Sequence, residues 1–198
     1  MLFDILTKAE NKKEMMSLLM VGVQKSSNER IVKKTLSGKF AGLELYIYFA
    51  LDEKMNMIVS EDVFAEMEIN IEEAWKMAFE NLHKSVTITS MTNALKECGM
   101  LDDSCDDDLG MYVISTERME KGAAAVFDRK VKEFVKEKGY KRVAILPSSI
   151  HEMLLLPFDN PFTNENELSM MVETINSTEV EPSDQLIDKA IIISSDEL

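Results

Sequence analysis

The sequence predicts an α+β fold, in which helices pack on an antiparallel or mixed sheet. Three observations indicate this class. Short runs rich in β-branched and aromatic residues, of which residues 43–50 are the longest, have the length of buried strands. Residues 71–82 repeat apolar side chains at helical spacing. In the C-terminal half the two kinds of segment follow one another in the order β-β-α-β-β-α-β, with one tight turn between the two clearest strands.

The N-terminal half begins with a weak helical period over residues 1–16, followed by a short apolar run, 17–23, typical of a strand. Asn28 is placed to cap a helix that would carry Ile31, Val32 and Leu36. Residues 43–50 and 57–59 are then predicted as strands, because both are apolar and rich in residues that favour pleated backbone.

Two further helices are expected before residue 85. Ser60 can cap a short helix that buries Phe64 and Met67. Asn70 precedes a helix whose first turn holds acidic side chains, where the positive end of the helix dipole stabilises them. Its apolar stripe consists of Ile71, Ala74, Trp75, Ala78, Phe79 and Leu82. The stripe explains Trp75 as a core residue without any ligand.

The C-terminal half is expected to hold five strands separated by two helices. The strands are predicted at 111–115, 122–127, 142–146, 150–156 and 190–194. Asp128 should begin the first helix and Gly139 should end it, since glycine is the usual residue just past a helix. The second helix covers 165–176 and should bury Leu168, Met171, Val172 and Ile175. Residues 147–149 form the turn before the fourth strand.

The run from Leu101 to Asp108, closed by Gly110, is polar and acidic and is expected to be an exposed loop, because its like charges repel. We therefore divide the chain into an N-terminal α+β half, residues 1–100, an acidic loop, 101–110, and a C-terminal α+β half, 111–198. The alternative is one compact domain.

The formal net charge of −14 is distributed unevenly. Residues 40–108 carry sixteen acidic and four basic side chains, and residues 158–198 carry ten and one. Residues 118–142 have the opposite balance, with nine basic and four acidic side chains. This pattern indicates solubility, or an acidic surface that attracts a basic partner or imitates a nucleic-acid backbone. Direct nucleic-acid binding is not expected, since core-spaced apolar residues interrupt the basic stretch 129–142.

Cofactor, metal and membrane functions find no support in the sequence. No apolar run approaches the ~18 residues that span a membrane, and an acid at Asp4 interrupts the first apolar stretch, so we expect a cytoplasmic protein. Cys98 and Cys105 are expected as free thiols, with too few histidines nearby for a zinc site. Neither register of the acidic run 102–108 fits a calcium loop, and phosphate-binding glycine loops are absent.

The block Leu146-Pro147-Ser148-Ser149-Ile150-His151-Glu152 resembles an uncharacterised bacterial family of unknown function. Residues 58–81 and 111–124 resemble that family as well, so the likeness covers roughly residues 18–193. The chain departs from the family pattern at residues 158–162. The resemblance implies a shared α+β fold and a bacterial cytoplasmic setting, and it implies no activity.

The same block holds the candidate site residues Ser148, Ser149, His151 and Glu152. A catalytic hydroxyl needs a base within hydrogen-bond reach and a group that orients the base. If these residues lie on a strand, alternation puts Ser149 and His151 on one face and Glu152 on the other, which is poor geometry for a triad. The simpler interpretation is a hydrogen-bonded turn that can still line a pocket. Two basic residues are the candidate anion partners there: Arg118 and Arg142.

These observations favour a non-catalytic intracellular protein that binds or regulates another macromolecule, with a protein as its partner. The alternative is a small hydrolase or ligand-binding enzyme that uses Ser149 and His151. A third hypothesis is an acidic nucleic-acid mimic, which requires the acids of 40–108 and 158–198 to form one continuous face. The sequence makes no prediction of oligomeric state.

Overall fold

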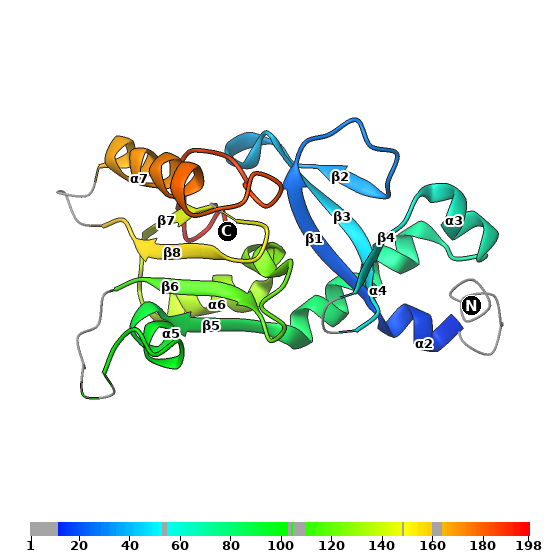
Figure 1. Ribbon diagram of the computed structural model, residues 1–198, viewed down its shortest axis with the longest axis horizontal. Coiled ribbons are helices and arrows are strands. Elements are labelled where there is room, and N and C mark those ends of the chain that lie inside the picture. Colours follow the sequence, from blue (N-terminus) through cyan, green and yellow to red (C-terminus); the bar gives the residue numbers. More distant parts are fainter. Residues whose placement is uncertain (1–11, 53–54, 103, 105–109, 148, 160–163) are drawn as a thin grey trace.

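The computed structural model describes residues 12–52, 55–102, 104, 110–147, 149–159 and 164–198. Within these ranges the chain forms two antiparallel sheets with helices packed on them, which confirms the α+β fold. The sheets lie side by side along the long axis of the molecule (Figure 1). A single apolar cluster takes in buried residues of both sheets, from Leu19 in the first to Ile193 in the second.

The first sheet is centred on β3, the long apolar run of the sequence. β1 pairs with β3 along one edge, and the shorter β2 and β4 pair with it along the other. The strands are β1 (Leu19–Lys25), β2 (Lys33–Thr35), β3 (Leu43–Ala50) and β4 (Asn56–Ile58). Side chains alternate along β3, so Leu45 and Ile47 point to one face while Tyr46 and Tyr48 point to the other.

Helix α4 (Ile71–Ser85) covers the face of the first sheet that carries Leu45. Lys34, which is in register with Leu45, places its Nζ 4.5 Å from the centre of the Trp75 ring on α4. Asn70 caps the helix as predicted, because its side chain accepts hydrogen bonds from the first-turn amides. The predicted stripe is buried at Ala74, Trp75, Ala78 and Leu82. The other helices of this half are α2 (Lys12–Ser17), η2 (Gly38–Phe40), a 3₁₀ turn, and α3 (Glu61–Glu66).

The second sheet has the order β5-β6-β8-β7-β9 and is antiparallel throughout. Its strands are β5 (Val86–Ser90), β6 (Tyr112–Thr116), β7 (Arg142–Leu146), β8 (Met153–Pro157) and β9 (Ile191–Ser194). Its helices are α5 (Met91–Glu97), η3 (Gly122–Phe127), α6 (Arg129–Glu137) and α7 (Glu165–Thr178). α7 packs on one face through Leu168 and Val172. The opposite face joins the main core.

The prediction of a strand at 122–127 is wrong, because these residues form the 3₁₀ helix η3. Lys121, with φ of 52°, turns the chain just before it. The residues from Gly122 to Val126 are all buried, and Gly122 lies against the backbone of β6. A run of small residues therefore lets a tight helix sit where a bulkier segment could not approach.

The helix predicted after Asn28 is also wrong. Residues 33–35 form β2 instead, paired with β3, and Val32 is buried. Pairing with a neighbouring strand outweighs the local helical signal. The sequence missed β5 and α5 altogether. The strand predicted at 150–156 begins at Met153, so the three residues before it belong to a loop.

Helix α7 is present as predicted, but its buried face differs from the prediction, and Ile175 is only partly buried. Leu168 and Val172 are buried, but Met171 is 45% exposed and Asn176 is buried in its place. Asn176 Nδ2 donates to the carboxylate of Asp188 at 2.6 Å, which gives the buried amide a partner.

β5 precedes the acidic run of the sequence, and β6 follows it, yet the two are paired strands of one sheet. Within the acidic run, Asp102 is exposed and accepts hydrogen bonds from the amide and hydroxyl of Ser104. Residues 103 and 105–109 lie outside the described ranges, Cys105 among them, while Cys98 is an exposed free thiol. The division of the chain into two halves stays a prediction.

Two side chains from outside β9 form hydrogen bonds with backbone groups on its outer edge. The Ser195 amide donates to Lys141 O on the β7 side, so Ile192 and Ser194, which are out of phase with it, direct their backbone groups outward. The Ile192 carbonyl accepts a hydrogen bond from Lys39 Nζ. The Ser194 amide donates to the carboxylate of Glu197 at 3.1 Å.

Candidate functional site

The connection between β7 and β8, residues 147–152, holds most of the candidates taken from the sequence. Ser148 lies outside the described residues. Ser149 is 5% exposed and its backbone forms a bridge with Gln185. The Ser149 hydroxyl accepts a hydrogen bond from the backbone amide of His151 at 2.9 Å. This hydroxyl therefore closes the loop on itself, as a turn serine does.

The imidazole of His151 uses both of its nitrogens in contacts with the chain. Nδ1 accepts a hydrogen bond from the backbone amide of Lys121 at 3.3 Å, so the proton of the neutral ring is on Nε2. Nε2 lies 3.3 Å from the carboxylate of Asp184. The His151 carbonyl accepts a hydrogen bond from Ser115 Oγ at 2.8 Å. His151 thus ties the loop to β6, to the start of η3 and to the segment before β9.

The alternation of side chains expected for Ser149 and His151 on a strand does not apply to the observed loop. Both residues precede β8, so the premise that they share a strand face is wrong. Since Lys121 and Asp184 occupy the ring nitrogens, neither nitrogen is placed to take a proton from Ser149.

Glu152 lies near His151, whereas Arg118 makes its hydrogen bonds with residues of the N-terminal half. Burial raises the pKa of Glu152, and the nearby His151 offsets only part of that rise. Arg118 donates to the Asp52 carbonyl and to Asn56 Oδ1, at 3.4 Å in the second case. The guanidinium of Arg118 is thereby directed to the first sheet.

Arg142 lies at the opposite end of β7 from the 147–152 loop. Its guanidinium donates to the Phe158 carbonyl at 3.2 Å and lies 5.1 Å from the centre of the Phe158 ring. With Lys39 and Lys189 it lines a separate hollow of about 420 Å³ beside β9. The structure therefore does not bring Arg142 together with the other candidates.

Buried polar side chains line the Tyr46 face of β3. Tyr46 and Tyr48 are each 1% exposed. Burial raises the pKa of Tyr48 to about 12, and burial also raises the pKa of Tyr46. Arg118 is close enough to Tyr48, and Asp184 to Tyr46, to act on them electrostatically. The two phenols stay neutral at every physiological pH and act as packing groups.

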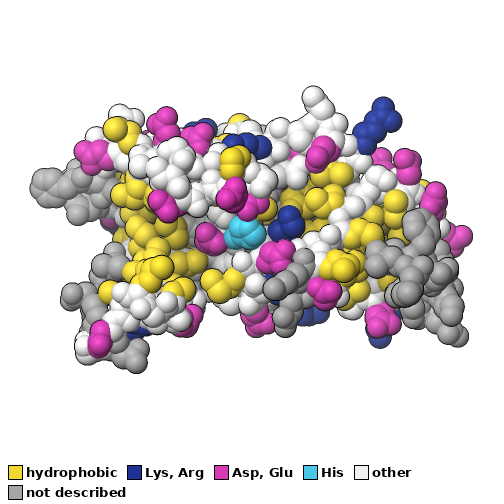
Figure 2. Space-filling model, viewed as in Figure 1, with side chains coloured by type: hydrophobic (Ala, Val, Ile, Leu, Met, Phe, Trp, Pro, Cys, Tyr) yellow, Lys and Arg dark blue, Asp and Glu magenta, His cyan; other side chains and the backbone are white. Residues whose placement is uncertain are grey.

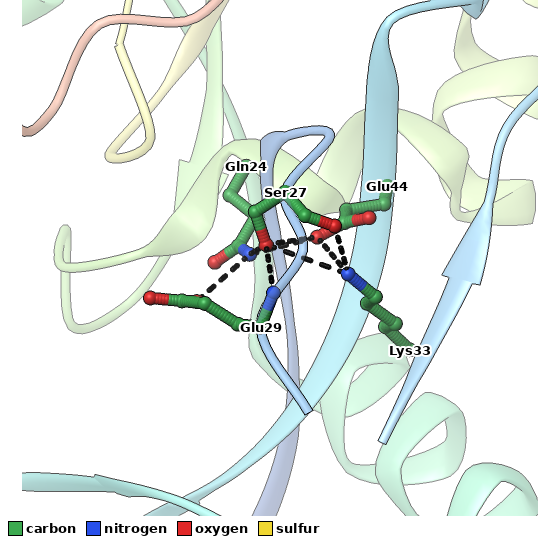
Figure 3. Close-up of polar contacts among 5 residues, drawn as sticks. All are labelled: Gln24, Ser27, Glu29, Lys33 and Glu44. Carbon is green, nitrogen blue, oxygen red and sulfur yellow. Dashed lines mark hydrogen bonds and ion pairs between the residues drawn. The ribbon is translucent and has the colours of Figure 1, made fainter. Parts of the chain in front are cut away.

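Glu44 lies on the same face of β3 and is nearly inaccessible, with a side chain 2% exposed. Its Oε1 accepts hydrogen bonds from Gln24 at 2.9 Å, Ser27 at 2.9 Å and Lys33 at 3.2 Å (Figure 3). Burial alone would raise the pKa of Glu44, but these three hydrogen bonds together outweigh it and hold the pKa below its ordinary value. The cluster fixes the β1–β2 connection to β3.

A second region has the form of a binding site, and the sequence did not single it out. It is a groove of about 600 Å³ between the C-terminal part of α4 and the segment where η3 meets α6. Grooves of this size hold small ligands or single side-chain groups of a partner. The lining residues are Lys76, Phe79, Glu80, His83, Lys84, Phe127, Asp128 and Arg129.

Three of the lining residues form a hydrogen-bonded chain. The carboxylate oxygens of Asp128 lie 2.9 and 3.1 Å from His83 Nδ1, and Nε2 of the same ring lies 3.0 Å from the guanidinium of Arg129. A guanidinium can only donate, so Nε2 is the acceptor and the proton of the neutral ring is on Nδ1, facing Asp128. Asp128 is also the N-cap of α6, since it accepts from the amide of Lys130 at 2.8 Å.

Aromatic rings form the apolar walls of the groove, and their neighbours hold them in place. Phe79 stacks on Trp75 with ring centres 5.8 Å apart. Phe127 meets Phe40 edge to face at 4.8 Å, which links the groove to η2, the 3₁₀ turn between β2 and β3. Aromatic pairs of this kind prefer defined geometries, so the walls are expected to keep their shape.

Local sequence patterns could have indicated only the residues that α4 contributes to this groove. Lys76, Glu80, His83 and Lys84 recur at helical spacing beside the buried stripe of α4, and such a face is ordinarily just solvated. The other two charged residues, Asp128 and Arg129, are 45 and 46 residues further along the chain from His83. No local pattern joins the two segments.

Comparison with known proteins places the chain in a family without assigning an activity. The model of a family of unknown function, DUF5688, matches residues 3–192. The chain belongs to this family. No curated protein and no solved structure matches the chain. A shared domain of unknown function is consistent with the resemblance seen in the sequence.

The described residues contain no group of three or more His, Cys, Asp or Glu side chains arranged to hold a metal ion. None of the described helices is both long enough and apolar enough to cross a membrane.

Glu152→Gln is expected to raise the melting temperature near neutral pH. Because burial raises the pKa of Glu152 in the folded state, the charged form is disfavoured there. Stability is therefore lost as the pH rises above the unfolded pKa, about 4.3, and the amide escapes this loss. Thermal melts at about pH 4 and about pH 7 measure the effect. The exposed Glu133→Gln is the control, and an equal gain at both pH values would contradict the assignment.

Proposed function

We propose that this chain is a non-catalytic binding protein that holds an acidic segment of a partner protein in the groove between α4 and α6. The observation that carries the proposal is the pairing of three cationic side chains with two aromatic walls. The cations are Lys76, Lys84 and Arg129, and the walls are Phe79 and Phe127. Charged and apolar groups in one concave surface are typical of sites that recognise a short peptide segment.

The groove is a local exception to the charge of the whole chain. At −14 the molecule repels acidic proteins at long range, so an acidic partner has to be recognised through close contact in a positive site. Such a site selects a short segment rather than a large acidic surface. It also makes binding sensitive to salt, since exposed charges are screened within about 8 Å at physiological ionic strength.

The types and contacts of the residues that line the groove support a binding role. No Ser, Thr or Cys is among the described residues that line the groove, and the ring nitrogens of His83 already contact Asp128 and Arg129. The hydrolase alternative draws little support from Ser149 and His151, for the reasons of geometry given above.

The mimic hypothesis requires a continuous acidic face. On the face shown in Figure 2, acidic side chains are scattered among apolar and uncharged ones, with apolar surface over the second sheet. This arrangement does not reproduce the regular charge of a nucleic-acid backbone. The face therefore favours a binding protein over a mimic.

Affinity capture with matched charge variants tests the proposal. Native lysate is passed over the wild type, over the double variant Lys84→Glu and Arg129→Glu, and over a control with Lys13→Glu and Lys136→Glu. The control changes the same charge at two exposed helical positions that do not line the groove. Washes use about 0.05 M and about 0.5 M salt, which lie on either side of physiological screening.

We expect at least one protein that the wild type and the control retain at low salt and that the groove variant loses. Its acidic segment should be recoverable by crosslinking to α4 or α6. Retention of the same proteins by all three baits would overturn the proposal. So would the absence of any retained protein on the wild type.

A further inference from the structure

The chain of hydrogen bonds from Asp128 through His83 to Arg129 suggests which group the groove recognises. Asp128 is the buried end of this chain, with a side chain 7% exposed, and Arg129 is the exposed end. A buried carboxylate that fixes the tautomer of a histidine is a positioning device, because the second ring nitrogen then has a defined role. Here that role is to accept a hydrogen bond from Arg129.

We propose that Asp128 and His83 position Arg129 to bind one side-chain carboxylate of the partner segment, next to an apolar side chain that packs on Phe79 and Phe127. The inference rests on the proposed function and names the chemistry of its ligand. Asp128 and His83 act through Arg129, so they are positioning residues, while Arg129 makes the contact.

Charge decides between a carboxylate and a phosphate. The groove holds three cations, Lys76, Lys84 and Arg129, against two carboxylates, Glu80 and Asp128. With His83 neutral, the difference of three and two leaves a net charge of +1. One carboxylate carries one negative charge and matches this value, whereas a phosphate group carries about −1.5 to −2 at neutral pH.

Geometry agrees with this choice. A guanidinium presents five N–H donors in a planar fork, and the contact with His83 holds one of its nitrogens. The remaining donors can pair with both oxygens of a planar carboxylate. Held from behind by His83, Arg129 loses less rotamer freedom on binding than a free arginine would, and preorganisation of this kind strengthens binding.

Asp128→Asn separates positioning from folding. Asparagine caps a helix as well as aspartate, so its Oδ1 can still accept from the amide of Lys130. Its NH₂ group takes the place of the second carboxylate oxygen, 3.1 Å from His83 Nδ1, and competes with Oδ1, 2.9 Å away, for that nitrogen. The ring is then no longer fixed in one tautomer, and the fraction that carries its proton on Nε2 can no longer accept from Arg129.

The test uses defined fluorescent peptides. Each has one variable residue between two phenylalanines in a glycine-serine host, and the variable residue is glutamate, glutamine or phosphoserine. Binding to the full chain is measured by fluorescence anisotropy for the wild type, Asp128→Asn and Arg129→Lys. The exposed Lys136→Arg serves as the control. Long-range ¹H–¹⁵N spectra report the tautomer of His83. If Asp128 had a purely structural role, its substitution would leave this tautomer unchanged.

We expect the wild type to bind the glutamate peptide about 10-fold more tightly than the glutamine peptide. Asp128→Asn should lose part of that preference while melting within about 2 °C of the wild type, and its His83 should show both neutral tautomers instead of one. Arg129→Lys keeps the charge and should lose the preference too, since it lacks the fork.

Three results would overturn the inference. They are equal binding of the glutamate and glutamine peptides, tighter binding of the phosphoserine peptide, and an unchanged glutamate preference in Asp128→Asn. If capture from lysate still depends on the groove in any of these cases, the inference fails and the binding function stands. If the glutamate preference is found but no captured protein depends on the groove, the carboxylate site stands and the proposed partner binding fails.

Discussion

Gly122→Ala is expected to lower the free energy of unfolding by about 3 kcal/mol, which for a chain of this size corresponds to roughly 6–12 °C in melting temperature. A Cβ at this position would lie 2.4 Å from Ser115 Oγ and 2.8 Å from both the His151 carbonyl oxygen and the Thr116 amide nitrogen. Two of the three atoms belong to the backbone and cannot rotate away. The methyl group must therefore displace η3 or β6 and break the contact between Ser115 and His151.

Urea unfolding of the wild type, Gly122→Ala and Gly38→Ala measures this effect. Gly38 has open space where its Cβ would lie, but its φ is +63°, so alanine there brings conformational strain alone. That strain costs about 1–2 kcal/mol. If Gly122→Ala lowers the free energy of unfolding by no more than Gly38→Ala does, the crowding that the structure shows around Gly122 would be contradicted.

Glu44→Gln has the second-largest expected effect, a loss of about 2–3 kcal/mol near neutral pH. The amide cannot pair with the charge of Lys33, which is largely withdrawn from solvent, with a side chain 21% exposed. The amide also adds donors where Gln24 and Ser27 already donate to Oε1. Because Lys33 keeps some contact with water, the loss falls below that of a fully buried pair.

The loss at Glu44 should depend on pH in a defined direction. The hydrogen bonds hold the pKa of Glu44 below its ordinary value in the folded protein. Its contribution is therefore present above the unfolded pKa and disappears as the pH falls through the lower, folded one. Denaturation at about pH 7 and about pH 3 should show a gap between wild type and variant that narrows in acid.

Glu29→Gln is the matched control for Glu44→Gln. Glu29 is exposed and belongs to the same cluster, 3.5 Å from Gln24 (Figure 3). Its substitution should change stability by less than about 0.5 kcal/mol. Equal effects at the two positions would show that Glu44 is not the centre of the cluster.

Local patterns were sufficient to predict the elements whose signals lie within a few residues. Asn70 and the stripe of α4 are such a case, because cap and period are both contiguous in sequence. β3 is another, since a run of eight residues that are all apolar or aromatic except Glu44 is long enough to indicate a strand. The prediction at η3 was wrong because the contacts that decide its conformation are not local in sequence. A run of alanines fits several conformations, and the crowding around Gly122 comes from residues far along the chain.

The candidate site shows the same limit. The sequence grouped Ser149 and His151 because they are neighbours, and their roles in a turn followed from that proximity. Arg142 was grouped with them as a basic residue nearby in sequence, but β7 carries it to the other end of the sheet. The pairing of His83 with Asp128 depends on how η3 and α6 pack against α4, and η3 is one of the elements that were predicted wrongly.

The outer edge of β9 has a consequence for self-association. An exposed strand edge invites another chain to add a strand through its free backbone groups. Here Lys39 occupies the carbonyl of Ile192 and Glu197 occupies the amide of Ser194, so an incoming strand finds two of its bonding positions taken. Lys39 belongs to η2 beside the first sheet, so the β9 edge of the second sheet is protected by a residue from beside its neighbour. The same contact that joins the two sheets within one molecule is thus expected to oppose strand addition by a second molecule at the β9 edge.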